Sequence, residues 1–441
     1  MVIVGALVPA WVLADLIIGT SGPDVLTGTP EADTLDGKGG ADTTMGLGGD
    51  DVHIIDLADD EVIEGAGEGN DTVRSPVTYS LPIFVENLIL TGIDAINGEG
   101  NSLDNRLTGN NVNNTLNGGA GSDTMLGKGG DDLYIVDASG DVASESANRG
   151  TDTVRSSVTY RLRRNVEKLT LTGTAAINGE GNEHDNSITG NSAGNVLEGK
   201  AGLDTLNGKD GNDRLLGGDG NDTLVGGLGQ DTFEFNAPLD ESINVDRITD
   251  FNPSDDVMRL GGAFFPTLTS AGTLQASAFL AAAVADDLSD RILYDPATGI
   301  LRYDADGTGA TAPVQFGRLA AGLAVTNADF AVRSPVAAPV SYTTQIQPIF
   351  NARCTSCHTG GGAPQGLRLD AQNSFAHLVN VNSSEVPSLK RVKPSDPDNS
   401  YLVHKIEGTA AEGSRMPLGQ SPLSEAQISL IRQWIIAGAA P

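Results

Sequence analysis

The chain has 441 residues, enough for two or three domains, and it is strongly acidic. It carries 58 acidic against 27 basic residues, a net charge of -31, with 56 glycines and an aromatic content of 5%. This charge disfavours nucleic acids and anionic membrane surfaces as binding partners. Residues 342–441 hold 8 Lys/Arg and 7 Asp/Glu, so nearly all the excess negative charge lies upstream of them.

The chain begins with an apolar stretch from Val2 to Ala14 that is too short to span a membrane. A signal peptide has basic residues ahead of its apolar stretch, and this stretch lacks them. Val12 and Ala14 nevertheless precede a plausible cleavage point at Asp15. Residues 1–18 are therefore predicted to be either a leader or the first strand of the fold that follows. No other segment is long and apolar enough to be a transmembrane anchor.

Four nine-residue units run without a gap from Gly199 to Glu234, and each opens with a glycine. Each has a second glycine three places on, an aspartate at its sixth place and an aliphatic or aromatic residue at its eighth. Glycine allows the left-handed backbone of a tight turn, and the apolar residue can enter a core. Two units therefore predict one coil of a parallel β-roll, in which aspartates 18 residues apart stack about 4.8 Å from one another. Carboxylates this close need a cation between them, and hard oxygen ligands select calcium.

Ten aspartates occupy the sixth place of such a unit, which makes each one more than an ordinary turn residue. The predicted calcium ligands are Asp24, Asp33, Asp42, Asp51, Asp123, Asp132, Asp204, Asp213, Asp222 and Asp231. Some neighbouring units are degraded, with Thr44 and His53 in apolar places. Four units have an asparagine instead, which lacks the charge and predicts weak binding or a purely structural coil: Asn105, Asn114, Asn186 and Asn195.

These units resemble the glycine-rich nonapeptide repeats of the repeats-in-toxin (haemolysin-type) family. The resemblance implies a calcium-binding β-roll over residues 19–236 that holds multiple calcium ions. Within it, residues 28–110 recur at 109–191 with an offset of 81, and each copy includes a half-buried strand, predicted at 85–90 and 166–171. The identity of the copies indicates duplication of one solenoid unit rather than a catalytic site.

The nine-residue period ends before residues 237–333. This region resembles the segment that follows the repeats in secreted members of that family, which implies a β-rich cap over the last coil. Residues 334–341 are rich in proline and alanine and are predicted to form a short, stiff linker.

The only two cysteines, Cys354 and Cys357, are followed directly by His358. Cys-x-x-Cys-His is the attachment motif of c-type haem, in which the histidine also binds the iron. A redox disulfide and half of a zinc site are the alternatives, but a zinc site needs two more ligands and a redox dithiol expects a βαβ context.

Two flanking helices complete the predicted all-α domain at 342–441. One is expected at 346–353, and the other begins at Ser424, which forms a capping box with Gln427, and stops at Gly438. The pattern resembles a small class I-like cytochrome c of the planctomycete type, and the resemblance implies that Met416 is the second axial ligand of the iron. His404 is the competing ligand.

The whole fold is thus predicted as multidomain, with a mainly parallel β-solenoid and a small all-α cytochrome c domain. The predicted function is single-electron transfer to a redox partner protein by an exported protein, extracellular or at the cell surface, that passes through the periplasm, where haem c is attached. Two alternatives stay open: a structural or adhesive calcium-binding protein whose haem domain is not essential, and a haem peroxidase with an open iron position.

Overall fold

The computed structural model describes residues 15–147, 149–333, 340–360, 362–394, 396–410, 412, 414–418, 421–436 and 438–440. Most of the predicted leader (1–14) and of the predicted linker (334–339) lie outside the described residues. The protein divides into two compact units, residues 1–334 and 335–441, and each is described by itself. Among the helices of the described ranges, none is long and apolar enough to cross a membrane.

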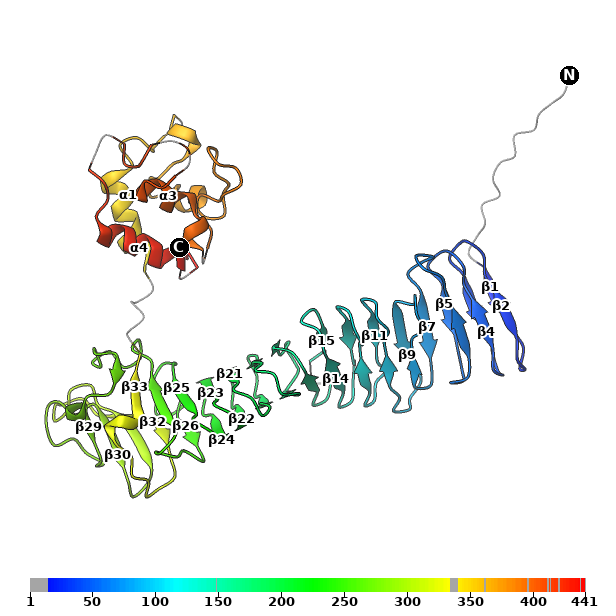
Figure 1. Cartoon of the computed structure of the whole chain (residues 1–441), viewed down its shortest axis with the longest axis horizontal. Coiled ribbons are helices and arrows are strands. Elements are labelled where there is room, and N and C mark those ends of the chain that lie inside the picture. The colour runs from blue at the N-terminus through cyan, green and yellow to red at the C-terminus, as the bar shows by residue number, and fades with distance from the viewer. Residues whose placement is uncertain are drawn as a thin grey trace. The chain divides into compact units, whose positions relative to one another are not determined.

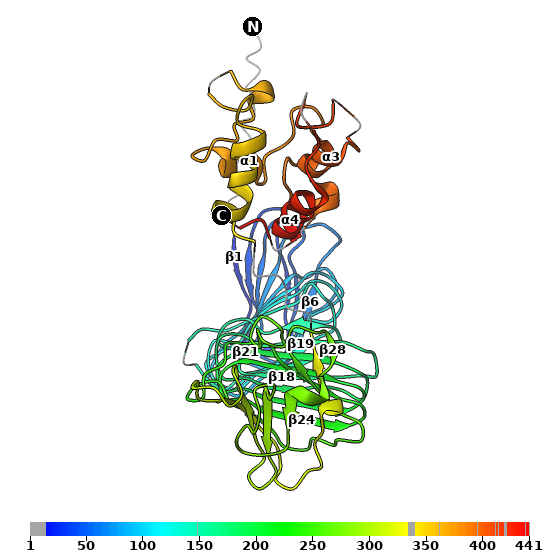
Figure 2. The same ribbon diagram turned by 90° about the vertical axis from the view of Figure 1, so that its left-hand side faces the viewer.

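The first unit is a parallel β-solenoid whose short strands stack coil upon coil, as Figure 1 shows from the side and Figure 2 along the stack. One sheet contains, in spatial order, β1 (Leu16–Ile18), β3 (Thr34–Asp36), β5 (Val52–Ile54), β7 (Thr72–Ser75), β9 (Asn87–Leu90), β11 (Arg106–Thr108), β13 (Thr124–Leu126) and β15 (Val142–Ser144). A small sheet beside its start contains β2 (Val25–Thr27), β4 (Thr43–Met45) and β6 (Glu61–Ile63).

Two further sheets continue the stack. One runs through β8 (Tyr79–Ser80), β10 (Gly98–Glu99), β12 (Thr115–Asn117), β14 (Leu133–Val136), β16 (Thr153–Ser156), β18 (Lys168–Leu171), β20 (Ser187–Thr189), β22 (Thr205–Asp210), β24 (Thr223–Leu228) and β26 (Asp246–Ile248). The other runs through β17 (Tyr160–Arg161), β19 (Gly179–Glu180), β21 (Val196–Ala201), β23 (Arg214–Asp219), β25 (Thr232–Phe235) and β27 (Val257–Leu260). The strands predicted at 85–90 and 166–171 are confirmed as β9 and β18.

The 18-residue stacking follows from the side chain at the eighth place of each unit. Leu206 in β22 pairs with Leu224 in β24, and Leu215 in β23 pairs with Phe233 in β25. All four are at most 1% exposed, so they form the continuous core of the solenoid. Residues on either side of them alternate to the other face of the strand, as the period of two requires, although Leu216 and Glu234 are buried there. The β-solenoid predicted from the period is therefore confirmed.

The coils continue past residue 236, where the nine-residue period ends. β26 pairs in parallel with β24, and β27 with β25, although their sequences no longer show the repeat. The stack is then covered by β28 (Gly272–Thr273), β29 (Phe279–Leu280), β30 (Ile292–Asp295), β31 (Ile300–Tyr303), β32 (Val314–Arg318) and β33 (Phe330–Val332). Phe235, Phe265 and Phe316 pack edge to face at ring distances of 4.9 and 5.2 Å and seal this end of the core.

The second unit is a small helical domain. It contains a π-helical turn at Tyr342–Ile346 followed by α1 (Gln347–Arg353), α2 (Ser374–Leu378), α3 (Tyr401–Glu407) and α4 (Glu425–Ile436), with 3-10 turns at Pro364–Gly366 and Pro397–Asn399. The predicted capping box is present, since Ser424 and Gln427 exchange backbone-to-side-chain bonds of 3.0 and 3.2 Å. The rings of Tyr342 and Trp434 lie 4.9 Å apart and join the first and last helices in one core.

Candidate functional site

A ladder of buried aspartates runs along the solenoid. From Asp33 onward, the Oδ1 atom of each accepts a hydrogen bond from the backbone N–H of the corresponding residue one coil earlier. Asp204 donates to Asp222 over 2.8 Å, and Asp213 donates to Asp231 over 2.8 Å. This bond fixes each carboxylate at the edge of the core, where nearly all are buried.

The second oxygen, Oδ2, has no hydrogen-bond partner in eight of the ten predicted ligands. These eight are Asp42, Asp51, Asp123, Asp132, Asp204, Asp213, Asp222 and Asp231. Each Oδ2 faces the glycine that opens its own turn, and a Cβ at Gly199 or Gly208 would collide with it. A buried carboxylate oxygen without a partner is costly, so the oxygens and the space in front of them fit a cation.

The same eight turns share a backbone conformation. Their second and fourth residues have positive φ, for example 77° at Lys209 and 126° at Gly211 ahead of Asp213. The second place is Lys or Leu in five of them: Lys38, Leu47, Lys128, Lys200 and Lys209. A left-handed backbone costs such residues about 1–2 kcal/mol each. The eight, called open turns below, therefore hold local strain at the place where the unpartnered oxygens lie, which is typical of a ligand site.

The other turns are closed by their own hydrogen bonds. The Oδ2 of Asp24 and that of Asp33 accept from the backbone N–H of Thr20 and Thr29, at 2.5 and 2.6 Å. Burial alone would raise the pKa of Asp33, but hydrogen bonds from Asp15 and Thr29 lower it overall. Asp24 and Asp33 stay predicted ligands, but their carboxylates already have partners.

The asparagine turns close in another way. The Nδ2 of Asn195 donates to the carbonyl of Ile177 over 2.6 Å, and the Nδ2 of Asn114 donates to that of Ile96 over 2.6 Å. The amide thus joins two coils without a cation. Asn105 and Asn186 make the same kind of bond to the coil before them.

Burial makes the charged form of three open-turn aspartates unfavourable: Asp204, Asp213 and Asp231. It raises the pKa of Asp204 to about 7 and the pKa values of Asp213 and Asp231 to about 6, although backbone hydrogen bonds oppose the rise. The charge of the stacked neighbour adds to it, as Asp222 does for Asp204. Without a cation, the ladder therefore repels itself at neutral pH.

Six further aspartates belong to the ladder but do not stand in a unit that opens with glycine. Each accepts through Oδ1 from the backbone N–H of the ladder residue 18 to 25 positions earlier: Asp60, Asp71, Asp141, Asp152, Asp246 and Asp256. Asp60 and Asp141 lack the opening glycine, and the others follow insertions. The Asp-Thr-Val sequences at Asp71 and Asp152 resemble Asp-Thr-Leu at Asp204 and are the signal that could have identified them.

In the second unit, Cys354, Cys357, His358 and Met416 all line one cavity of about 270 Å³. Cys354 caps the C-terminal end of α1, and the turn that follows brings His358 back, its N–H donating to the carbonyl of Cys354 over 3.0 Å. Apolar residues make up much of the remaining wall: Leu367, Leu369, Leu378, Ile406 and Leu423. Both cysteines are free thiols.

The imidazole of His358 is held by one of its nitrogens. Nδ1 lies 3.0 Å from the carbonyl oxygen of Leu367, so it carries the proton and leaves the Nε2 lone pair available to a metal. His404 lies on α3, with Nδ1 3.2 Å from the Thr409 hydroxyl, and it is not among the described residues that line the cavity. The structure thus groups Met416, and not His404, with the Cys-x-x-Cys-His motif.

Comparison with known proteins identifies the repeats. Four copies of the RTX calcium-binding nonapeptide repeat match residues 18–52, 99–134, 180–208 and 198–233, and these ranges contain all eight open turns. The chain therefore contains RTX calcium-binding nonapeptide repeats folded as a β-solenoid. All the matched residues lie in the first unit.

Among solved structures, the chain is similar to extracellular lipase LipA from Serratia marcescens, with 14% identity and a TM-score of 0.22. The match covers 60% of this chain and 45% of the lipase, so the chain spans less than half the length of that enzyme. No curated protein matches the sequence.

Proposed function

We propose that the second unit carries one covalently attached c-type haem and exchanges single electrons, while the calcium-binding solenoid serves as its rigid extracellular support. The observation that carries this proposal is the shared cavity of Cys354, Cys357, His358 and Met416. The four residues span more than 60 positions of sequence, so their convergence does not follow from the motif alone.

The four residues that line the cavity are of the types that hold a c-type haem. The two thiols would hold the haem covalently through thioethers, and His358 Nε2 and the Met416 sulfur would bind its iron. When bound, the haem supplies an iron that accepts and releases one electron. Burial raises the pKa of Cys354 to about 11, so this thiol is not the low-pKa thiolate that a redox dithiol would use. This disfavours a redox disulfide as the alternative to haem.

The location follows from the two sites together. Calcium sites of the weaker classes fill at the millimolar concentrations found outside cells, and haem c is attached outside the cytoplasm. The protein would thus pass through the periplasm and act extracellularly or at the cell surface, where a redox partner protein takes up or delivers the electron.

A spectrum of the chain expressed with haem-maturation machinery tests this proposal. Met416→Ala should remove the sulfur-to-iron absorption band of the oxidised protein, lower the reduction potential and allow small molecules to bind the iron. His404→Ala is the matched control and should leave the spectrum unchanged.

Three results would contradict the proposal. Absence of covalent haem after maturation would end the electron-carrier function and favour a structural or adhesive role. Loss of the sixth ligand in His404→Ala would make the iron bis-histidine-ligated. Ready binding of external ligands by the wild-type iron would favour a peroxidase.

A further inference from the structure

The ladder is interrupted at two corresponding places. The spacing from Asp51 to Asp71 and from Asp132 to Asp152 is 20 residues instead of 18, and the two places are related by the 81-residue offset. In each, a glutamate stands 18 residues after an opening glycine, where the next coil of an uninterrupted run has another glycine: Glu64 after Gly46 and Glu145 after Gly127. A third carboxylate therefore enters the ladder at each interruption.

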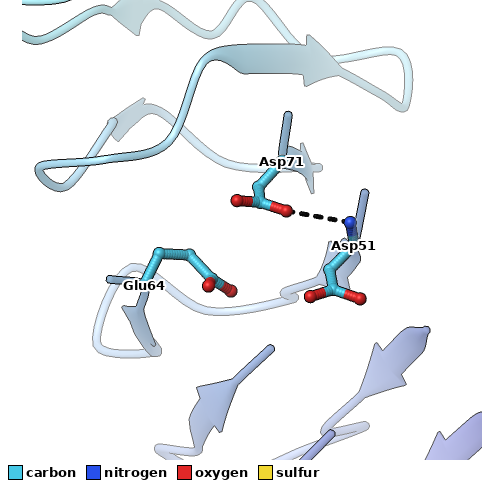
Figure 3. Close-up of side chains that lie close together, drawn as sticks. All are labelled: Asp51, Glu64 and Asp71. Carbon is cyan, nitrogen blue, oxygen red and sulfur yellow. Dashed lines mark hydrogen bonds between the residues drawn. The ribbon is translucent and has the colours of Figure 1, made fainter. Parts of the chain in front are cut away.

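Three carboxylates converge at the first interruption. One oxygen each of Asp51, Glu64 and Asp71 lies within 4.8 Å of the others, and Figure 3 shows the side chains turned toward a common point. All three residues are buried, with exposed fractions of 1%, 8% and 0%. Asp51 Oδ2, Glu64 Oε2 and Asp71 Oδ2 have no hydrogen-bond partner among the described residues. Each residue thus presents one free oxygen in a place that water does not reach.

The second interruption repeats the arrangement. Asp132, Glu145 and Asp152 are buried, and one oxygen of each again lies within 4.8 Å of the others. Asp132 Oδ2 has no partner, while Glu145 Oε2 accepts a 3.1 Å bond from the Ser146 N–H. Burial and the nearby charge of Glu145 raise the pKa of Asp152 to about 7. The same three residue types therefore meet at both places.

A polar residue in the core holds each glutamate. His53 Nε2 lies 2.7 Å from Glu64 Oε1, while Nδ1 lies 2.8 Å from the Thr44 hydroxyl. Gly46 N–H donates to the same Oε1 over 3.0 Å, so only Oε2 is left for a ligand. In the second copy, the hydroxyl of Tyr134 donates to Glu145 Oε1. His53 and Tyr134 stand at the same place of their units, 81 residues apart, where the four units from Gly199 to Glu234 have leucine or phenylalanine.

We propose that Asp51, Glu64 and Asp71, and likewise Asp132, Glu145 and Asp152, form two calcium sites of a second kind, in which one nonapeptide aspartate is joined by a glutamate and by an aspartate from outside the repeat. His53 and Tyr134 are the positioning residues. Calcium accepts several carboxylate oxygens in a flexible arrangement, whereas magnesium demands a near-ideal octahedron and usually keeps several waters, so a buried set of three carboxylates favours calcium.

These sites should bind more tightly than the open turns. Three carboxylates give each a higher negative charge than a stacked pair of aspartates, and affinity for calcium rises with the number of charged ligands. They should therefore fill first as calcium is added and empty last under chelation. The inference does not depend on the haem.

Calcium counting on the full-length protein tests this inference. Stripped protein is dialysed at a series of fixed free calcium concentrations, and bound calcium is measured by elemental analysis. Glu64→Gln and Glu145→Gln should each remove one calcium from the tightest class, and the double variant two. Glu61→Gln is the matched control, because Glu61 lies exposed on β6, three residues from Glu64, and should leave the count unchanged.

If both glutamine variants bind as many calcium ions as wild type, the proposal is wrong but the nonapeptide sites are not affected. If wild type binds no calcium at all, the nonapeptide sites are contradicted as well. Terbium(III) provides a measurement that does not require those variants to fold. Tyr134, bonded to Glu145, should sensitise terbium emission at the first equivalents, and Tyr134→Phe should remove that part of the signal. Equal emission from wild type and Tyr134→Phe would also overturn the proposal.

Discussion

At the residue scale, the sixth place of each nine-residue unit holds either an aspartate or an asparagine. An asparagine amide can donate a hydrogen bond, whereas an aspartate carboxylate can only accept one. The amide of Asn195 donates to the Ile177 carbonyl and joins two coils by itself. The carboxylate of Asp213, one coil later, has an oxygen with no donor to accept from. At these two positions, an amide NH₂ group or a carboxylate oxygen in the same place therefore determines whether the coil needs a cation.

Replacing the asparagine of an amide-closed coil by aspartate should make that coil require calcium. In Asn195→Asp, the new carboxylate faces the Ile177 carbonyl and the Asn191 side-chain oxygen, at present 2.6 and 3.1 Å from Nδ2. The lost bond and the repulsion should cost about 1–3 kcal/mol. The calcium midpoint of folding, followed by circular dichroism, should rise. Asn207→Asp is the control, since Asn207 uses only its oxygen, accepting from Lys209 N–H, and its midpoint should not move.

Protonation should replace calcium in part. The folded pKa values of Asp204, Asp213 and Asp231 are raised to about 6–7 from 3.8, so these groups bind protons more tightly when folded. In chelator, their contribution to stability is therefore greatest below about pH 4 and is lost as the pH rises through 6–7. Lowering the pH from 7.5 to 5 in chelator should increase the β-signal. A β-signal that falls over this range would contradict the ladder's raised pKa values.

At the scale of elements, one buried glutamate joins the last coils to the cap. Glu234 on β25 contacts Arg214 on β23 at 2.6 Å, Arg259 on β27 at 3.7 Å and Arg333, just after β33, at 2.6 Å. Burial would raise the pKa of Glu234, but hydrogen bonds from Arg214 and Arg333 lower it overall. A single carboxylate thus joins β23, β25 and β27 to the segment that follows β33.

Removing its charge should loosen this end of the solenoid. Glu234→Gln leaves three arginines beside one another and should cost about 3 kcal/mol, because one partner of a buried ion pair is lost. Thermal unfolding in saturating calcium should occur at a lower temperature, with amides of β27 and β33 exchanging faster. Glu241→Gln, at an exposed position, should unfold like wild type.

Features that one nine-residue unit specifies by itself could be predicted from the sequence, whereas features that arise only when coils stack could not. The coils from Gly199 to Glu234 were predictable, because each nine-residue unit specifies its own turn and core residue. Glu64 was not, since its importance comes from lying beside Asp51 and Asp71 after stacking. The continuation into β26 and β27 was missed for a similar reason: insertions hide the spacing, and only the pairing with β24 and β25 reveals it. The grouping of Met416 with His358 was expected only by resemblance.

At the scale of the whole molecule, the two units should respond differently to loss of calcium. Self-repulsion of the ladder should leave most of residues 19–236 disordered, whereas the second unit has its own core around Trp434 and should stay folded. Chelation should remove most of the β-signal and leave the fluorescence of Trp434 unchanged in a Trp11→Phe background. Calcium should restore the β-signal, and magnesium should not. A β-signal that is unchanged in excess chelator at pH 7.5 would contradict this.

The amide-closed coils have a consequence for how the solenoid grows. Those at 101–114 and 182–195 directly precede the open turns at 118–132 and 199–231. In a linear array, starting a coil alone is the slow step, and adding one to an existing edge is easier. A coil closed by amides forms before any cation arrives and is a template on which the next coil stacks. We therefore expect calcium to control elongation along the array, and a few asparagines to set where it starts.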